Sequence, residues 1–408
     1  MRNINSSTLL LHLFLCISLL VGFNFNEDSG GGGSVIDFHS TWPLILDPFS
    51  PNLTNYDFKF PLHYIIGSAI FNIIGNQEFY RLFFVLVAFF LPNLFFKCLK
   101  VKFYNFDHNI LYLLSLTLLV LPSVRTSAIW ANTQFTGIIF FLLSIYYFLK
   151  WEKKDDKNIT FNLFFNLIFI SLAVYTRQIY AIVYLYFLFV YLRNLKINKF
   201  FYVCIITFCL SLPGLYYVYF FPKILQVTFD SSLQDSILVN LSMISFYFVP
   251  FVLVLIFQKK IKLQRNFLIV LFFSFVFIFF LSQFFTYNYK NGGGVLMKFS
   301  LIIFNDFTFF FLTSLFGLIC IYIICENKIE NYFLTLSIIL GISAYIISQK
   351  YFEPMMIILL FLIYKNSYTG YFLRKTKNTF FFILYFTGYY ISVLIADYFN
   401  IKKFLIFF

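Results

Sequence analysis

The chain has 408 residues, of which 61% are hydrophobic, 24% aromatic and only 12% charged. Soluble domains are about half apolar and about a quarter charged, so this composition excludes the soluble classes. A formal net charge of +13 would suit a nucleic-acid partner, but the basic residues lie in short clusters between apolar runs. Because such clusters mark cytoplasmic loops, the composition predicts an all-α, polytopic membrane protein and excludes nucleic-acid binding.

Apolar runs separated by charged clusters predict about 11–13 transmembrane helices in a single integral membrane domain, residues 1–408. The first run, Leu9 to Gly22, has the length of a signal peptide but no small-residue cleavage site follows it. We therefore expect an uncleaved first helix, with a signal peptide as the alternative. The thirteen candidate segments are residues 8–23, 79–96, 109–123, 128–149, 160–176, 178–192, 200–220, 238–257, 266–285, 307–325, 331–348, 354–364 and 379–396.

Alternate loops between these segments differ in charge. One set, which includes "KWEKKDDKN" and "QKKIKLQR", holds most of the lysines and arginines. This asymmetry predicts that the basic loops and the N terminus are cytoplasmic, and that the other loops face a periplasm or a lumen. The six cysteines have no metal-binding spacing, so we interpret them as small apolar residues.

The longest outward loop covers residues 24–78. It begins with "NEDSGGGGS", whose glycines Gly30 to Gly33 we interpret as a flexible linker that folds the loop back toward the membrane. Farther along, "PLHYIIGSAIFNII" (61–74) is apolar but too short to span a bilayer comfortably. We expect this stretch to form a helix at the membrane interface.

Polar residues gather at the outward ends of the predicted helices. Ionisable side chains at the edge of a membrane span are costly and commonly face a cavity or a partner, although a lone arginine such as Arg125 also snorkels to lipid phosphate. The side chains of interest are Glu27, Asp28, Asp37, His39, Asp57 and Lys59 in the first outer loop, Arg125, Arg177 and Gln178 at helix junctions, and Lys290, Lys350 and Tyr351 in later loops.

These residues resemble motifs of the GT-C superfamily of membrane glycosyltransferases, and in particular the family of dolichyl-phosphate-glucose alpha-1,2-glucosyltransferases. That family carries an acidic motif after its first helix, which "IDFHSTWP" resembles through Asp37, His39 and Pro43. A second motif is similar to "YDFKFPLHY", which contains Asp57 and Lys59. Two later motifs resemble the pair "RQ" at 177–178 and "QKYFEP" at 349–354.

The resemblance implies a GT-C-like fold and an inverting transfer of a hexose from a polyprenyl- or dolichyl-phosphate sugar to a lipid-linked glycan or a similar acceptor. Such a transfer needs a carboxylate base, for which Asp37 is the first candidate, Asp28 the second and Glu27 the third. Cations and amides would hold the leaving phosphate and the sugar. The candidates for substrate binding are Arg177, Gln178, His39, Asp57, Lys59, Lys290, Lys350 and Tyr351.

Two other functions stay open, a polymerase or ligase of the O-antigen kind and a lipid or solute transporter. Such polymerases and ligases place the large outer loop late in the chain, and transporters favour broken helices with polar groups at mid-membrane. We expect the lipid-phosphate donor, the glycan acceptor and membrane lipid as partners, and no cofactor or side-chain metal site, with a divalent metal ion as an open alternative. The short cytoplasmic loops favour a bacterial inner membrane over the endoplasmic reticulum, with the active site on the periplasmic or lumenal side.

Overall fold

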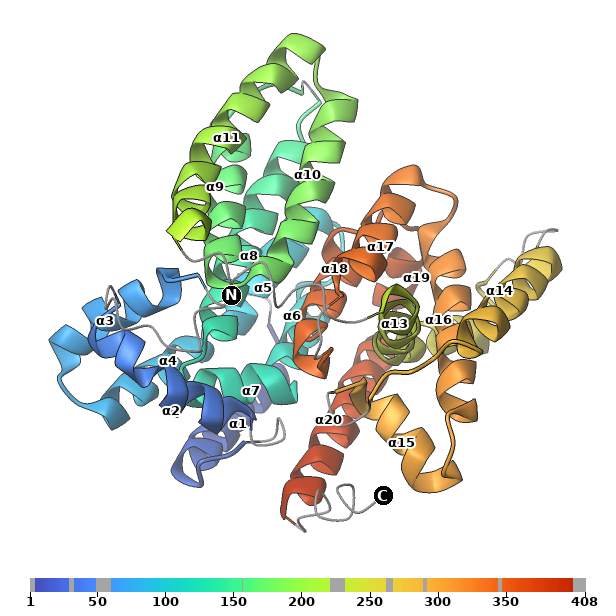
Figure 1. The fold of residues 1–408 in the computed structure, drawn as a ribbon, viewed down its shortest axis with the longest axis horizontal. Helices are drawn as coiled ribbons and strands as arrows, with labels where there is room; N and C mark the ends of the chain where they lie inside the picture. The colour runs from blue at the N-terminus through green and yellow to red at the C-terminus, as the bar shows by residue number, and fades with distance from the viewer. Residues whose placement is uncertain are drawn as a thin grey trace. The chain divides into compact units, whose positions relative to one another are not determined.

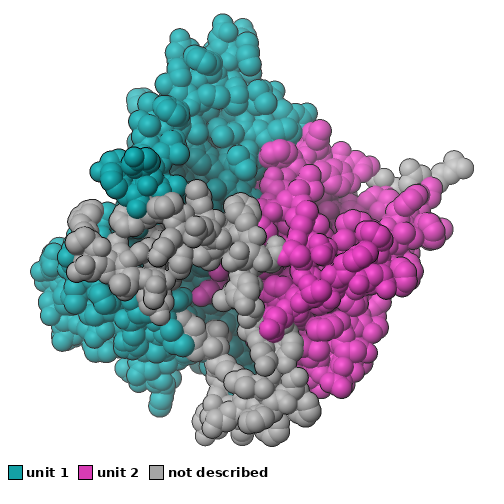
Figure 2. All heavy atoms as spheres, in the orientation of Figure 1, with its two compact units in different colours: residues 1–225, 383–400 teal, residues 226–382, 401–408 magenta. Residues whose placement is uncertain are grey.

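The computed structural model describes residues 4–28, 33–48, 60–155, 157–220, 232–261, 267–288, 292–343 and 347–398. The regular structure of these residues is helical and includes no strand. The chain divides into two compact units, shown in teal and magenta in Figure 2. The first unit comprises residues 1–225 and 383–400, and the second comprises residues 226–382 and 401–408. The prediction of an all-α protein is confirmed, and each unit is described by itself.

The first unit begins with the apolar helix α1 and contains the short helices of the first outer loop, α2 and α3 (Figure 1). Helices α8 and α9 pack against each other along their lengths, and α3 packs against α2, α4, α8 and α9. Most of α20 (Thr376–Tyr398) also belongs to this unit. The other helices of the first unit are α1 (Ser6–Asn24), α2 (Gly33–Leu46), α3 (Leu62–Ile74), α4 (Gln77–Ala88), α5 (Leu91–Lys102), α6 (His108–Ser115), η1 (Leu116–Leu119), α7 (Pro122–Ile129), α8 (Thr133–Glu152), α9 (Phe161–Thr176), η2 (Gln178–Tyr180), α10 (Ala181–Asn194) and α11 (Ile197–Phe220).

The second unit is built around α13, the most buried of its long apolar helices. Helices α14, α15, α16 and α17 pack against α13, as do the shorter α18 and α19. The helices of this unit are α13 (Leu233–Phe257), α14 (Phe267–Ser282), α15 (Gly294–Phe304), α16 (Thr308–Cys325), α17 (Ile329–Gly341), η4 (Gln349–Tyr351), α18 (Met355–Leu362), α19 (Tyr368–Leu373) and the start of α20.

Seven helical segments in the described part of the chain are long and apolar enough to cross a membrane. The segment 108–119, made of α6 and η1, and the segment 122–129, which is α7, are bent by 63° relative to each other. If these two segments are counted together as one broken helix, they give an eighth span. The chain is therefore an integral multi-pass membrane protein. The seven segments are Ser6–Asn24, Gln77–Lys102, Thr133–Glu152, Ile197–Phe220, Leu233–Phe257, Thr308–Cys325 and Thr376–Ala396.

Each of the thirteen predicted apolar segments overlaps a helix, but several of these helices are shorter than the thickness of a bilayer. The count of about 11–13 spans therefore stays a prediction, because it requires short helices such as α9 and α14 to cross the membrane. Three stretches that the sequence assigned to outer loops are helical, namely α2, α7 and α15. Within the first outer loop α3 has nearly the predicted bounds, and Gly33 begins helix α2.

Small residues allow a close approach between α13 and α16. The hydroxyl of Ser314 on α16 donates a hydrogen bond to the carbonyl oxygen of Leu238 on α13, with a distance of 2.9 Å. A Cβ atom added to Gly317 would lie only 2.2 Å from the carbonyl oxygen of Leu241. Since apolar side chains gain little by leaving lipid for protein, this packing and hydrogen bonding hold the pair together.

The substitution Gly317→Ala tests this contact, because the new methyl group would meet backbone atoms, which cannot rotate away. We expect the free energy of unfolding to fall by about 1–3 kcal/mol, the usual cost of overpacking. Unfolding in detergent, followed by tryptophan fluorescence during a titration with SDS, measures the change. The matched control is Gly388→Ala, where a Cβ meets no atom within 4 Å. An equal fall in the free energy of unfolding in both variants would show that the contact between α13 and α16 does not require glycine at position 317.

Candidate functional site

The exit of the chain from α1 is held by a buried ion pair between Glu27 and Arg125. The Nε and Nη2 atoms of Arg125 donate to Oε1 and Oε2 of Glu27, at 2.9 and 2.8 Å, and both side chains are almost fully buried. Arg125 Nη2 also donates to the carbonyl oxygen of Ser18, and Nη1 donates to the Ser18 hydroxyl and to the carbonyl oxygen of Leu119. A guanidinium has five N–H groups, so every donor of Arg125 has an acceptor.

Other elements complete the surroundings of this pair. The hydroxyl of Tyr390 on α20 donates to Glu27 Oε2 at 2.9 Å, and the Tyr390 ring lies 4.5 Å from the Arg125 guanidinium. The indole of Trp130 donates to the carbonyl oxygen of Glu27 at 3.0 Å. A Cβ at Gly22 would lie 2.2 Å from Glu27 Oε2, so glycine leaves the space that the carboxylate occupies. These contacts favour a structural role for Glu27 over proton transfer.

A second arginine, Arg81 on α4, holds the residue before Glu27. Its Nη2 donates to Asn26 Oδ1 at 2.9 Å, and its Nε donates to the carbonyl oxygen of Ile129 at 3.1 Å. The guanidinium carbon lies 3.7 Å from the centre of the Trp130 ring. Asn26 has a φ of 51°, in the left-handed region that asparagine tolerates better than most residues. The two arginines thus fix the turn that leads into the outer loop.

The beginning of α8 brings three other elements together. The amide of Asn132 donates to the carbonyl oxygen of Ser34 on α2 at 3.4 Å. Arg177, directly after α9, donates from Nη1 to Gln134 Oε1 at 2.9 Å. The ring Nδ1 of His63, on α3, lies 2.8 Å from the Thr136 hydroxyl. Both helices of the outer loop and the α9–α10 turn therefore meet at the N-terminal end of α8.

The predicted carboxylates Asp28 and Asp37 belong to this region through α2. Asp28 accepts from the backbone N–H groups of Ser34 and Val35, at 3.3 and 3.4 Å, and so caps the first turn of α2. Asp37 lies on α2 itself and is half-buried. Burial and the charge of Asp37 raise the pKa of the Tyr64 hydroxyl on α3 above its ordinary value.

The other predicted residues are distributed as follows. His39 lies on α2 with its side chain exposed and its ring 5.9 Å from that of Trp130. Gln178 begins η2 beside Arg177. Lys350 and Tyr351 form η4 in the second unit. Asp57, Lys59 and Lys290 lie outside the described residues.

The second unit has a buried polar cluster of its own next to η4. The amide of Gln349 donates to the Tyr247 hydroxyl at 2.9 Å, and this hydroxyl donates to Glu353 Oε2 at 3.1 Å. Gln349 Oε1 accepts from the N–H of Val295 at 3.3 Å. Through these bonds η4, α13 and α15 are fixed to one another. In the described part of the chain no three His, Cys, Asp or Glu side chains are grouped as metal ligands.

Sequence reasoning missed Arg81 and Tyr390 and gave Arg125 too small a role. Arg81 stands within an apolar segment and three residues after Glu78, and an ionisable residue in such a segment is a signal of a buried partner. Tyr390 is one of 30 tyrosines and carries no such signal. Helix α2, which carries the half-buried Asp37, and the Arg177 guanidinium both contact the start of α8, and carboxylates and a guanidinium suit acid–base chemistry on an anionic substrate.

We expect Glu27→Gln to lower the free energy of unfolding by about 3–5 kcal/mol, because it leaves the Arg125 charge buried without its partner. The measurement is again SDS-induced unfolding in detergent. The double variant Glu27→Gln, Arg125→Met should lose less than the sum of the two single variants, since the charge left uncompensated by either single change is then gone.

The other arginine–glutamate pair supplies the control. Glu78 pairs with Arg81 at 3.1 Å, but the Glu78 side chain is 67% exposed. Glu78→Gln should therefore change the free energy of unfolding by no more than about 1 kcal/mol. Equal losses for Glu27→Gln and Glu78→Gln would contradict the structural role of the buried pair.

Comparisons of this chain with models of protein families, with curated proteins and with solved structures gave no match.

Proposed function

We propose that this protein is an inverting glycosyltransferase that moves a hexose from a polyprenyl- or dolichyl-phosphate sugar to a lipid-linked glycan or a similar acceptor. The observation that supports this proposal best is the meeting of α2, α3 and the Arg177 turn at the start of α8. This region combines carboxylates, which could deprotonate an acceptor hydroxyl, with a guanidinium, which could bind the leaving phosphate. Asp37 and Arg177, which belong to this region, are also residues of the GT-C-like motifs in the sequence.

The proposed base is Asp37. Glu27 is held in a bidentate ion pair, and both carboxylate oxygens of Asp28 accept from backbone N–H groups of α2. Asp37 is half-buried on the outward loop, near the Tyr64 hydroxyl. In the reaction the acceptor oxygen attacks the anomeric carbon, Asp37 takes the hydroxyl proton, and the bond from that carbon to the lipid phosphate breaks.

Arg177 is the proposed ligand of the leaving phosphate. Its side chain is half-buried, and the bond to Gln134 Oε1 orients the guanidinium. Gln134 in turn donates to the Ser123 hydroxyl at 3.1 Å, which connects the arrangement to α7. A guanidinium matches the geometry of a phosphate better than an ammonium does, since it donates two parallel hydrogen bonds. By the charge asymmetry of the loops, this site faces the periplasm or lumen.

A transporter is the second candidate, and one observation favours it. The segments 108–119 and 122–129 form a broken helix, bent by 63°, and the buried Arg125 lies on its second half. Transporters use broken helices of this kind at their substrate sites. The two functions differ in outcome, because a transferase releases a new glycoside and free lipid phosphate whereas a transporter changes only the location of its substrate.

Proteoliposomes supplied with polyprenyl-phosphate glucose, or in a second series with polyprenyl-phosphate mannose, and with a lipid-linked oligosaccharide acceptor test the base. We expect Asp37→Asn to lower the rate of hexose transfer by about 10²–10⁴-fold, the usual effect of losing a general base. Asp28→Asn should retain most activity, because asparagine caps a helix about as well as aspartate. Asp306→Asn, an exposed carboxylate in a later outer loop, is the control. Activity lost in Asp28→Asn but kept in Asp37→Asn would overturn the assignment, and no transfer by the wild-type protein would favour the transporter.

For the phosphate, we expect Arg177→Ala to raise the KM for the lipid-phosphate sugar at least tenfold, because a charge-assisted contact with the donor is lost. Arg177→Lys should recover only part of this affinity, since an ammonium cannot donate the two parallel bonds. The same proteoliposome assay measures both values over a range of donor concentrations. An unchanged KM in both variants would remove Arg177 from the donor site.

A further inference from the structure

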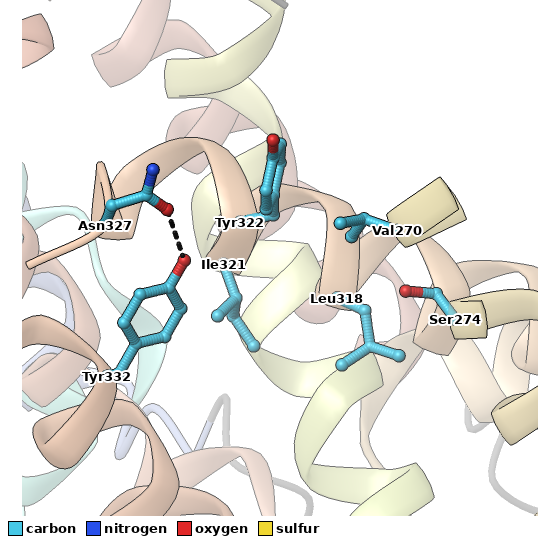
Figure 3. A pocket seen from close by; sticks show the side chains of 7 residues that line it. All are labelled: Val270, Ser274, Leu318, Ile321, Tyr322, Asn327 and Tyr332. Carbon is cyan, nitrogen blue, oxygen red and sulfur yellow. Dashed lines mark hydrogen bonds between the residues drawn. The ribbon is translucent and has the colours of Figure 1, made fainter. Parts of the chain in front are cut away.

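A hollow in the described part of the second unit lies between α14 and α16, and none of the predicted site residues lines it. Its volume is about 540 Å³, and a second hollow of about 330 Å³ shares Val270, Ser274 and Leu318 with it. Together the two form an open groove along the faces of α14 and α16. The walls of the larger hollow are Val270, Ser274, Leu318, Ile321, Tyr322, Asn327 and Tyr332 (Figure 3).

The groove is apolar along most of its length and polar at one end. Figure 3 shows Val270, Ser274 and Leu318 at one end and Asn327 and Tyr332 at the other. The hydroxyl of Tyr332 donates to Asn327 Oδ1 at 3.2 Å. From Leu318 to the end of α16 at Cys325 the helix rises by about 10 Å at 1.5 Å per residue. This length is about a third of the hydrocarbon core of a bilayer, which is about 30 Å thick.

The outer surface of α14 indicates what the groove opens onto. Only Ile278 and Leu281 of this helix are buried, while phenylalanines such as Phe272, Phe275 and Phe279 are more than half exposed. In a multi-pass membrane protein such a surface faces lipid chains.

The polar end carries an exposed cation, Lys328, which follows Asn327. Two carboxylates, Glu326 and Glu330, flank it in the sequence, and Glu326 accepts from the N–H and the hydroxyl of Ser367. The ring of Phe267, at the start of α14, lies 6.0 Å from that of Tyr322 near the end of α16, so the two helices run antiparallel here. An anionic headgroup at this end would therefore meet ammonium, amide and hydroxyl groups.

We propose that this groove binds one acyl chain of an anionic membrane phospholipid, whose phosphate contacts Asn327, Lys328 and Tyr332. The hydrocarbon chain extends from Tyr332 toward Ser274 and fills the space that loose packing of α14 on α16 leaves. The bound chain contributes to the contact between these helices, since a void between them would lack partner atoms. This site is separate from the proposed transferase residues and does not depend on their function.

Photo-crosslinking in liposomes tests the site, with phosphatidylglycerol that carries a diazirine in its acyl chain as the probe. Mass spectrometry of the labelled peptides should place most of the label on α14 and α16. Helix α11 is the internal reference, because its surface is largely exposed and apolar and would be labelled by any surrounding lipid. Label distributed over α11, α14 and α16 in proportion to exposure would overturn the proposal.

Matched variants test the two ends of the groove. Leu318→Trp fills the groove, and we expect it to lower labelling of α14 and α16 at least fivefold, whereas Leu312→Trp, at an exposed position of the same helix, should leave it within twofold of wild type. Ser274→Phe blocks the groove from the other wall and serves if Leu318→Trp does not fold. Lys328→Gln should weaken labelling by phosphatidylglycerol more than labelling by a zwitterionic probe.

Two results would assign the groove to another occupant. Competition by unlabelled polyprenyl phosphate, but not by unlabelled phosphatidylglycerol, would make it part of a donor-lipid site. A change in oligomeric mass in both Leu318→Trp and Ser274→Phe, with labelling unchanged, would make it a contact between protein chains.

Discussion

The buried pair of Glu27 and Arg125 fixes the place where the chain leaves its first helix, and much of the first unit is arranged around that place. Two charges in an apolar interior are stable only when nearly all of their hydrogen-bonding groups are satisfied. Here the five donors of Arg125 have acceptors on α1, on η1 and on Glu27, and Tyr390 supplies a further donor to the carboxylate. The pair therefore constrains α1, the broken helix and α20 at the same time.

The broken helix is itself explained by this constraint. A break in a membrane helix exposes backbone carbonyl groups, which must find partners inside the protein. One of these groups, the carbonyl of Leu119, accepts from Arg125, which lies six residues later on the other side of the break. The same side chain thus neutralises Glu27 and satisfies part of the broken backbone. This double use accounts for the burial of an arginine that the sequence alone places at a lipid-facing helix end.

The apolar runs predicted the helices well, because their signal is local and repeated over many residues. The residues that hold the helices together could not be predicted in the same way. Glu27 and Arg125 are 98 positions apart, and a single sequence contains no pattern that pairs them.

Helix α2 could not be predicted for a different reason, since the glycines before it suggested a flexible loop. Phe38 of that helix packs against Trp130, and Trp42 packs against Phe71 and Tyr80, through contacts that are visible only in three dimensions. Arg177, which the motif singles out, contacts the start of α8, but no sequence pattern pairs it with Gln134, 43 positions earlier.

The lengths of α9 and α10 place the Arg177 turn at an informative depth in the proposed orientation. At 1.5 Å per residue these helices, of 16 and 14 residues, rise by about 24 and about 21 Å. If α9 begins and α10 ends at the basic loops on the cytoplasmic side, the turn between them lies several ångströms short of the far edge of a hydrocarbon core about 30 Å thick. Arginine at such a depth requires polar partners, and Gln134 supplies one. In this orientation the turn lies below the lipid phosphates, which are in the headgroup region outside the hydrocarbon core. The proposed donor phosphate would therefore meet Arg177 within the protein and not in the surrounding headgroup layer.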